Sequence, residues 1–352
     1  MRSTLLALLI VLTLAEGTAA QIRTDAEGRP IRDRTDPDLG GAVVEGIATS
    51  DSLWLRGASK QVVRFNRQTG ERSVAALQVL DILADGPHLW ALVGLDANQG
   101  VVRDLRDPDQ PERRIYFEGS PVALFATNDG PGVLTTEKVL LPLADKWDRR
   151  PLAASVEPYA QVSALTDGML FVGYNKGEWG GGLRRIDVST GTISFVREAG
   201  ANSCGGLISP DCTPVVGIIT DTSTQGCILV GASLAHLSGR YGEVMRVCED
   251  QISSVFADPL PIKPGSIVNR AGQTWPFNSL IATDDGWIAV GQNRFARSRN
   301  GTITTGDVPI LRAWAGLQVS DPDDGLIFIE AACCWGSDTF VPYQMIAVPI
   351  GL

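Results

Sequence analysis

Hydrophobic and polar positions along this chain repeat one short unit. In each unit an apolar run meets a turn rich in Asp and Gly, and a second apolar run follows directly. Two apolar runs joined by such a turn indicate a β-hairpin. The unit occurs seven times, at 44–54, 79–90, 122–134, 162–171, 215–229, 279–288 and 317–328. Self-similarity of this kind identifies a repeat architecture before any local signal is considered.

Two of the units extend beyond the hairpin. Residues 62–66 precede the turn Thr69-Gly70, residues 183–187 precede Thr190-Gly191, and a further β-rich run follows each turn. A hairpin followed by two more strands makes a four-stranded antiparallel sheet, and a ring of such sheets is a β-propeller. We therefore predict an all-β, seven-bladed β-propeller of four-stranded antiparallel blades. Six or eight blades remain open because the third and sixth units are weakly marked.

The ends of the chain predict how it is organised and where it is located. Residues 1–20 carry Arg2, an apolar stretch and then small residues, which is the pattern of a secretory signal peptide cleaved near Ala20. Residues 21–41 are expected to form an N-terminal segment that contributes a ring-closing strand. Residues 42–352 are expected to form a single propeller domain, exported to the periplasm or secreted. No later segment is apolar for long enough to predict a membrane span.

The charge balance narrows the expected partners. Loss of the leader would remove Arg2 and Glu16, which leaves 29 Lys and Arg against 39 Asp and Glu, so the net charge stays at −10. An acidic exported protein is poorly suited to nucleic acid or to anionic membrane surfaces. We expect a monomer that binds a small molecule or a protein, with no cofactor.

Six cysteines in an exported chain favour disulfide bonds. Proximity along the chain favours Cys204 with Cys212, and Cys227 with Cys248 across two strands. The adjacent Cys333 and Cys334 could form a vicinal bridge, stay as two thiols or pair elsewhere. Because no C-x-x-C spacing occurs, we predict no metal site made of these cysteines.

The repeated phrase resembles a known group of proteins. Trp54, Trp90 and Phe171 stand at equivalent places after the Asp/Gly turn. This resembles the repeats of exported bacterial β-propellers, such as periplasmic sensor domains and streptogramin-lyase-like proteins, without pointing to one specific family. The resemblance implies that the loops after the second strand, and those between blades, gather on one face around the central channel.

The loop of the fourth unit, residues 173–182, is the most distinctive local sequence. Tyr174 and Trp179 offer flat faces for a ring, Asn175 and Glu178 offer polar groups, and five glycines would let the backbone approach a ligand closely. Alternatively, the glycines satisfy the turn geometry and Trp179 packs on a neighbouring blade.

Loops of the last three units would extend this site into an off-centre groove. The predicted ligand-binding residues are Tyr174, Asn175, Glu178, Trp179, Tyr241, Arg294, Cys333, Cys334 and Trp335, with His236 beside them.

The favoured function is an exported ligand-binding or protein-interaction module. One alternative is a lyase or hydrolase that uses Glu178 or His236 as acid or base while Arg294 holds an anion. Another is a scaffold that makes contacts around its rim.

Overall fold

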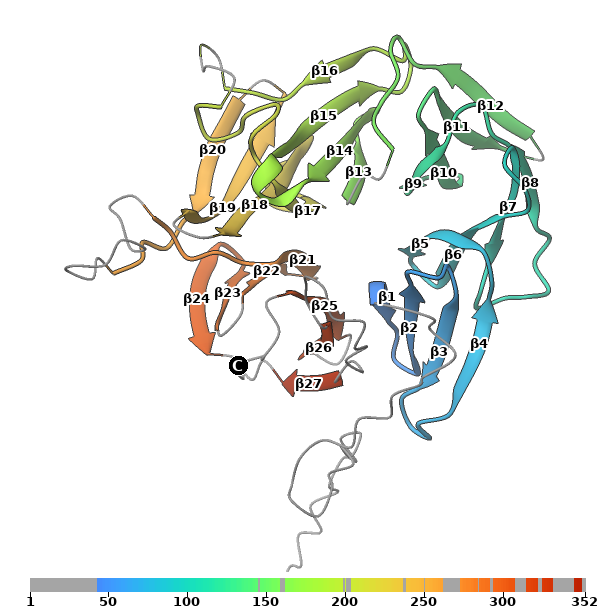
Figure 1. Ribbon diagram of the computed structural model, residues 1–352, viewed down its shortest axis with the longest axis horizontal. Helices are drawn as coiled ribbons and strands as arrows, with labels where there is room; N and C mark the ends of the chain where they lie inside the picture. The colour runs from blue at the N-terminus through green and yellow to red at the C-terminus, as the bar shows by residue number, and fades with distance from the viewer. Residues whose placement is uncertain are drawn as a thin grey trace, which may run out of the picture.

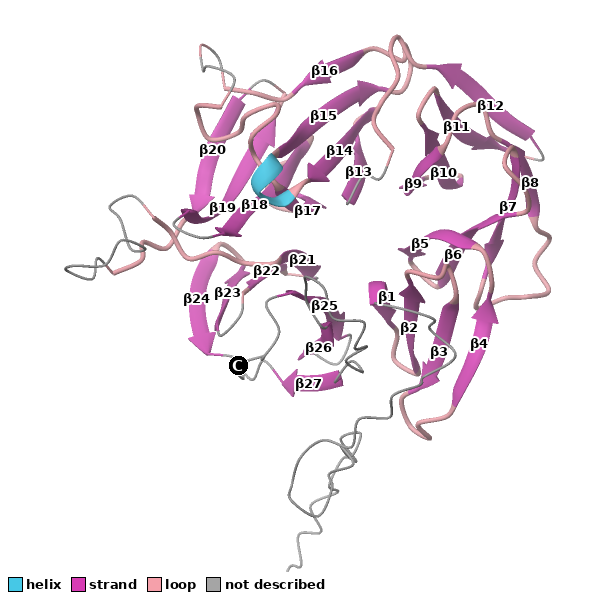
Figure 2. Ribbon diagram, in the orientation of Figure 1, coloured by secondary structure: helices cyan, strands magenta, loops and turns pink. Residues whose placement is uncertain are grey.

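The structure is a computed structural model that describes residues 43–144, 146–158, 162–198, 200, 204–236, 239–249, 251–261, 273–283, 285–291, 294–307, 315–321, 325–331 and 345–349. Antiparallel sheets stand around a common centre, and almost every regular element is a strand (Figures 1 and 2). The prediction of an all-β propeller is confirmed.

Six sheets have four strands each, paired in chain order, and we number them blades 1 to 6. Blades 1 to 3 contain β1 (Val43–Ala48), β2 (Ser52–Gly57), β3 (Val62–Asn66), β4 (Arg72–Ala76), β5 (Val79–Asp85), β6 (His88–Gly94), β7 (Gln99–Asp104), β8 (Arg113–Tyr116), β9 (Pro121–Thr127), β10 (Gly130–Thr135), β11 (Lys138–Leu143) and β12 (Lys146–Pro151). Blades 4 to 6 contain β13 (Val162–Thr166), β14 (Met169–Asn175), the short 3-10 helix η1 (Gly177–Trp179), β15 (Gly181–Asp187), β16 (Ile193–Phe195), β17 (Val215–Thr220), β18 (Cys227–His236), β19 (Gly239–Cys248), β20 (Gln251–Phe256), β21 (Ser279–Thr283), β22 (Gly286–Val290), β23 (Arg294–Arg299) and β24 (Thr302–Asp307).

The last repeat departs from the expected seven four-stranded blades. It forms a sheet with three described strands, β25 (Ala315–Asp321), β26 (Gly325–Ala331) and β27 (Met345–Pro349). This sheet lies between blade 6 and blade 1, because β25 contacts both β21 and β1. The described residues therefore form six complete four-stranded blades where seven were predicted. The segment 21–41, expected to supply a closing strand, lies outside the described residues.

The hydrophobic core lies between the blades. Five clusters of buried side chains each join two neighbouring blades, from the junction of blades 1 and 2 to that of blades 5 and 6. Strand β6 shows how one sequence serves two junctions. Leu89, Ala91 and Val93 belong to the cluster shared with blade 1, whereas Trp90 and Leu92 belong to the cluster shared with blade 3. Side chains alternate across a strand, so a strand buried on both faces needs an unbroken apolar run.

Ion pairs from the acidic turns also connect strands within single blades. In three blades the Asp between the first two strands pairs with an Arg of the third strand, as Asp51 with Arg64, Asp221 with Arg246 and Asp285 with Arg299. Blade 2 reverses the arrangement, since His88 contacts Asp104 at 2.7 Å. Burial opposes ionisation of Asp221, but hydrogen bonds from Ser223 and Arg246 outweigh it and lower the pKa of that carboxyl.

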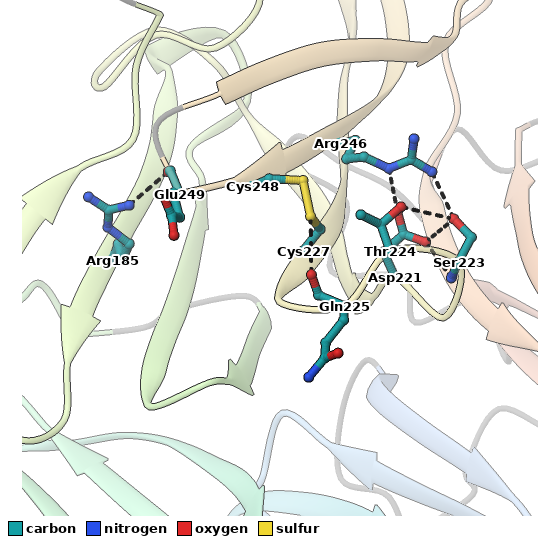
Figure 3. Close-up of a disulfide and its surroundings, with 9 residues drawn as sticks. All are labelled: Arg185, Asp221, Ser223, Thr224, Gln225, Cys227, Arg246, Cys248 and Glu249. Atoms are coloured by element: carbon teal, nitrogen blue, oxygen red, sulfur yellow. Dashed lines mark hydrogen bonds and ion pairs between the residues drawn. A yellow bond between two sulfur atoms is a disulfide. The ribbon is translucent and has the colours of Figure 1, made fainter.

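Both predicted cysteine pairs of the described region are formed, as Cys204–Cys212 and Cys227–Cys248. Figure 3 shows the second pair bridging β18 and β19 next to the Asp221–Arg246 ion pair. Cys227 and Cys248 are direct cross-strand partners with Cα atoms 4.4 Å apart. The backbone N–H and carbonyl of Cys227 form hydrogen bonds with Thr224 and Asp221, and not with Cys248. The two cysteines are therefore a non-hydrogen-bonded pair, in which the Cα atoms of an antiparallel ladder are closer together. Cys333 and Cys334 lie outside the described residues.

We expect the double substitution Cys227→Ser/Cys248→Ser to lower the free energy of unfolding by about 3 kcal/mol, because the bridge closes a loop of 21 residues. Urea unfolding with and without reductant measures this. Reductant should affect the parent more than the variant. Cys204→Ser/Cys212→Ser is the comparison, and its shorter loop should lead to a slightly smaller loss. Equal stability of the parent and the first variant would contradict the expectation.

Candidate functional site

The loop between β14 and β15 is tightly folded around η1. The Lys176 N–H donates to the Gly180 carbonyl at 2.8 Å, and the Gly177 N–H donates to Asn175 Oδ1 at 2.9 Å. Asn175 therefore holds the turn with its own side chain. Trp179 is 81% exposed, and Glu178 beside it is also exposed.

Three of the glycines in residues 173–182, Gly180, Gly181 and Gly182, are needed for contacts within the protein. Gly180 has φ +96° and Gly182 has φ +119°, and a Cβ at either position would overlap a carbonyl oxygen of Asp211 or Pro210. The Gly181 N–H donates to the Asp211 carbonyl at 3.1 Å. The loop thus rests on the segment that the Cys204–Cys212 bridge closes. At these three glycines the close backbone neighbour is the Pro210–Asp211 segment, Thr213 or Tyr174.

Tyr174 faces inward, in contrast to Trp179. It is 3% exposed in the cluster between blades 3 and 4, and its hydroxyl donates to the Glu157 carbonyl at 3.1 Å. Burial raises the pKa of Tyr174 to about 12, with Arg184 opposing this effect. Lys176 pairs with the Glu157 carboxylate at 2.6 Å, so the entering loop from blade 3 also supports the site.

The long hairpin of blade 5 lies against this loop, since β18 contacts η1, drawn in cyan in Figure 2. Tyr241 on β19 is partly buried against the cluster between blades 4 and 5, and burial raises its pKa. His236 is the last residue of β18, and its side chain lies outside the described part of the chain.

Arg294 contacts two residues of the segment between β20 and β21. It pairs with Asp258 at 2.7 Å and lies 5.2 Å from the ring centroid of Trp275. That ring occupies space which a Cβ on Gly291 would fill. The structure therefore brings the blade 4 residues together beside the blade 5 hairpin and gives Arg294 a separate set of partners. Cys333, Cys334 and Trp335 lie outside the described residues.

A second polar cluster, missed by the sequence analysis, lies on the inner strands of blades 1 and 2. Glu45 on β1 accepts a hydrogen bond from Arg56 at 2.7 Å and contacts Asp81 on β5. Asp81 accepts the N–H of Leu124, on the inner strand of blade 3, at 2.6 Å. Glu45 stands three residues before the end of the apolar run 43–48, and Asp81 stands three residues before the end of the run 79–84. An acid at the same place in two repeats was the signal that the sequence offered.

The electrostatics of this cluster follow from partial burial and from the short distances between its charged groups. Burial, and then the charge of Asp81, raise the pKa of Glu45 to about 8, while Arg56 acts in the opposite direction. Burial also raises the pKa of Asp81. Two neighbouring carboxyl groups oppose each other's ionisation, so the pair keeps a proton to a higher pH than a single carboxyl group would. Glu45, Asp81 and Leu124 lie on the first strands of blades 1, 2 and 3, so the cluster joins three blades.

Two other kinds of feature are absent from the described residues. No group of three or more His, Cys, Asp or Glu side chains is arranged to hold a metal ion in that part of the chain. Within the same residues, no helix combines the length and the apolar character needed to cross a membrane.

Comparison with known proteins shows the fold alone. No family model and no curated protein matches the chain. Among solved structures it is similar to the β-propeller domain of Cps50 (Swd1) from Myceliophteria thermophila, at 15% identity over 88% of this chain and 98% of that chain, with a TM-score of 0.52. It is also similar to the extracellular domain of a hybrid two-component system from B. thetaiotaomicron, at 13% identity over 87% of this chain, with a TM-score of 0.50. This chain spans 38% of that second chain.

Substituting glycines tests how the blade 4 loop is held. Gly182→Ala should lower the free energy of unfolding by about 2 to 4 kcal/mol, since the new Cβ meets the Pro210 carbonyl at a positive φ. Gly177→Ala is the matched control, because its φ is +59° but its surroundings are open, and it should cost only about 1 kcal/mol. Urea unfolding compares the two, and equal losses would refute the packing argument.

Stability should depend on pH through Glu45. In the unfolded chain Glu45 has its ordinary pKa of 4.5, so it has lost its proton over most of the range from pH 5 to 8, whereas the folded protein retains it. The free energy of unfolding should therefore fall as pH rises through this range. Glu45→Gln mimics the protonated form and should flatten this slope. Glu71→Gln, at an exposed position, should leave it unchanged. Urea midpoints at pH 5, 6, 7 and 8 measure the effect, and a parent whose stability rises over this range would contradict it.

Proposed function

We propose that this chain is an exported propeller that binds a small molecule or a protein through the loop of blade 4, with Trp179 as the central contact. The exposure of Trp179 on a fixed loop is the observation that carries the proposal. The apolar leader at residues 1–20 and the two disulfides support export, because such bridges persist in oxidising compartments.

The cost of this exposure favours a binding role over a packing role. Trp is highly buried on average in folded proteins, and it is enriched among the residues that dominate binding energy at interfaces. At 81% exposure, Trp179 leaves most of its apolar surface in water, and a ligand that covered it would recover that energy. The other exposed large apolar residues of the described region are exposed to 59% or less.

The surroundings of Trp179 would limit the entropy lost on binding. The Trp179 N–H donates to the Lys176 carbonyl, and Gly180 rests against the disulfide-closed segment. A loop already held in one conformation loses little freedom when it binds, which increases affinity. Glu178 and Asn175 add polar groups beside the ring, so the loop suits a ligand with a flat apolar part and hydrogen-bonding groups.

Thermal unfolding against a library of sugars, amino acids and aromatic metabolites tests this function. A ligand of the loop should raise the melting temperature of the parent and fail to do so in Trp179→Ala. Leu95→Ala is the matched control, since Leu95 is 57% exposed in the corresponding loop of blade 2. The control should respond as the parent does. A ligand response that survives in Trp179→Ala would refute the role of the loop, and silence of the whole library would direct the search to a protein partner.

A further inference from the structure

A groove of about 610 Å³ lies on the outer rim of the propeller, away from the blade 4 loop. Its lining comes largely from β8, the outer strand of blade 2, and β12, the outer strand of blade 3. These two strands lie side by side in Figure 1. Trp147 of β12 joins the two strands, because its Nε1–H donates to the Arg114 carbonyl at 2.8 Å. The residues that line the groove are Gln110, Pro111, Glu112, Arg113, Arg114, Ala144, Lys146 and Trp147. Its volume falls within the range of small-molecule sites.

The described lining of the groove is cationic, although the protein as a whole has a net charge of −10. Arg113, Arg114 and Lys146 line it, and none of them forms an ion pair with another described residue. Glu112 is the one acid in that lining, and it is already paired with Arg103 at 3.2 Å. Three cationic residues therefore border the groove, beside one carboxylate that is already paired with Arg103.

Two buried polar atoms of the groove have no hydrogen-bond partner among the described residues. They are Nη1 of Arg113 and Oε1 of Gln110. A buried donor on a charged group without a partner costs free energy that an anionic acceptor would recover. This nitrogen of Arg113 is therefore not committed to another described residue, and the guanidinium fork is suited to carboxylate and phosphate oxygens.

The groove also has an aromatic side chain, Trp147. Trp147 packs against the cluster between blades 2 and 3 and is only partly buried, and its hydrogen bond to Arg114 sets the orientation of the ring. A fixed indole ring beside cationic groups can contact the flat, apolar part of a ligand whose anionic part binds the cations.

We propose that this groove binds a small organic anion, in which a carboxylate or phosphate group adjoins a ring. The anionic group would pair with Arg113, assisted by Arg114 and Lys146, and the ring would lie against Trp147. This site is separate from the blade 4 loop, and its existence does not depend on the function proposed for that loop.

Isothermal titration calorimetry of the mature protein with phenyl phosphate and with benzoate tests the proposal, and the two probes distinguish phosphate from carboxylate recognition. At least one probe should bind, and benzyl alcohol, which has a similar ring without the charge, should not. Arg113→Gln and Lys146→Gln should each weaken binding, with about tenfold or more lost for Arg113 because a charge-assisted bond disappears.

Two control variants test whether the anion binds in this groove rather than elsewhere on the protein. Lys60→Gln removes an exposed charge from a loop of blade 1 and should leave the affinity unchanged. Trp179→Ala should also bind as the parent does, so failure here and failure of the blade 4 function are distinguishable. The proposal is overturned if neither anion binds at millimolar concentration, if benzyl alcohol binds equally well, or if Arg113→Gln and Lys146→Gln bind with the affinity of the parent.

Discussion

Neighbouring blades cover one another's apolar faces, and the rest of the structure depends on this mutual burial. Each of the five described clusters contains side chains from two adjacent blades, so none of these clusters belongs to a single blade. A sheet that is apolar on both faces must be covered on both, and a ring provides this for every member. The contact of β25 with β1 places the last described sheet next to blade 1.

Burial in the ring leaves the connecting loops and the outer strands free to differ among blades. The blade 4 loop uses its glycines and the Cys204–Cys212 segment to hold η1 in place, and Trp179 is left in solvent. At the outer edge of the junction between blades 2 and 3, β8 and β12 leave a cationic groove. Both features lie beside well-packed junctions between blades, which helps to hold them in a definite shape.

The repeats allowed the fold to be predicted, because two apolar runs and an Asp/Gly turn specify a hairpin through local interactions. The turns after β3 and β15 illustrate this, since Asn66 and Asp187 each accept backbone N–H groups two and three residues ahead. Both cysteine pairs of the described region followed from proximity along the chain. The seventh repeat was harder to predict, because a fourth strand carries no local signal as distinct as that of the hairpin.

The candidate site was predicted less well, because its properties depend on contacts between distant segments. Residues 173–182 do not reveal that Pro210 and Asp211 occupy the space beside the glycines, or that Tyr174 turns inward toward Glu157. Glu45 and Asp81 belong to different repeats, and only the ring brings their carboxyl groups together. Residue type identified Trp179, whereas its exposure came from the structure.

The alternation along β6 has a consequence for how this protein can change during evolution. Ala91 and Leu92 are consecutive in the chain, yet the first contributes to the junction with blade 1 and the second to the junction with blade 3. A compensating change for a substitution at Ala91 therefore belongs among residues such as Val62, whereas one for Leu92 belongs among residues such as Val133. Covariation in this molecule should thus follow the junctions between sheets, and adjacent positions of one strand should vary independently.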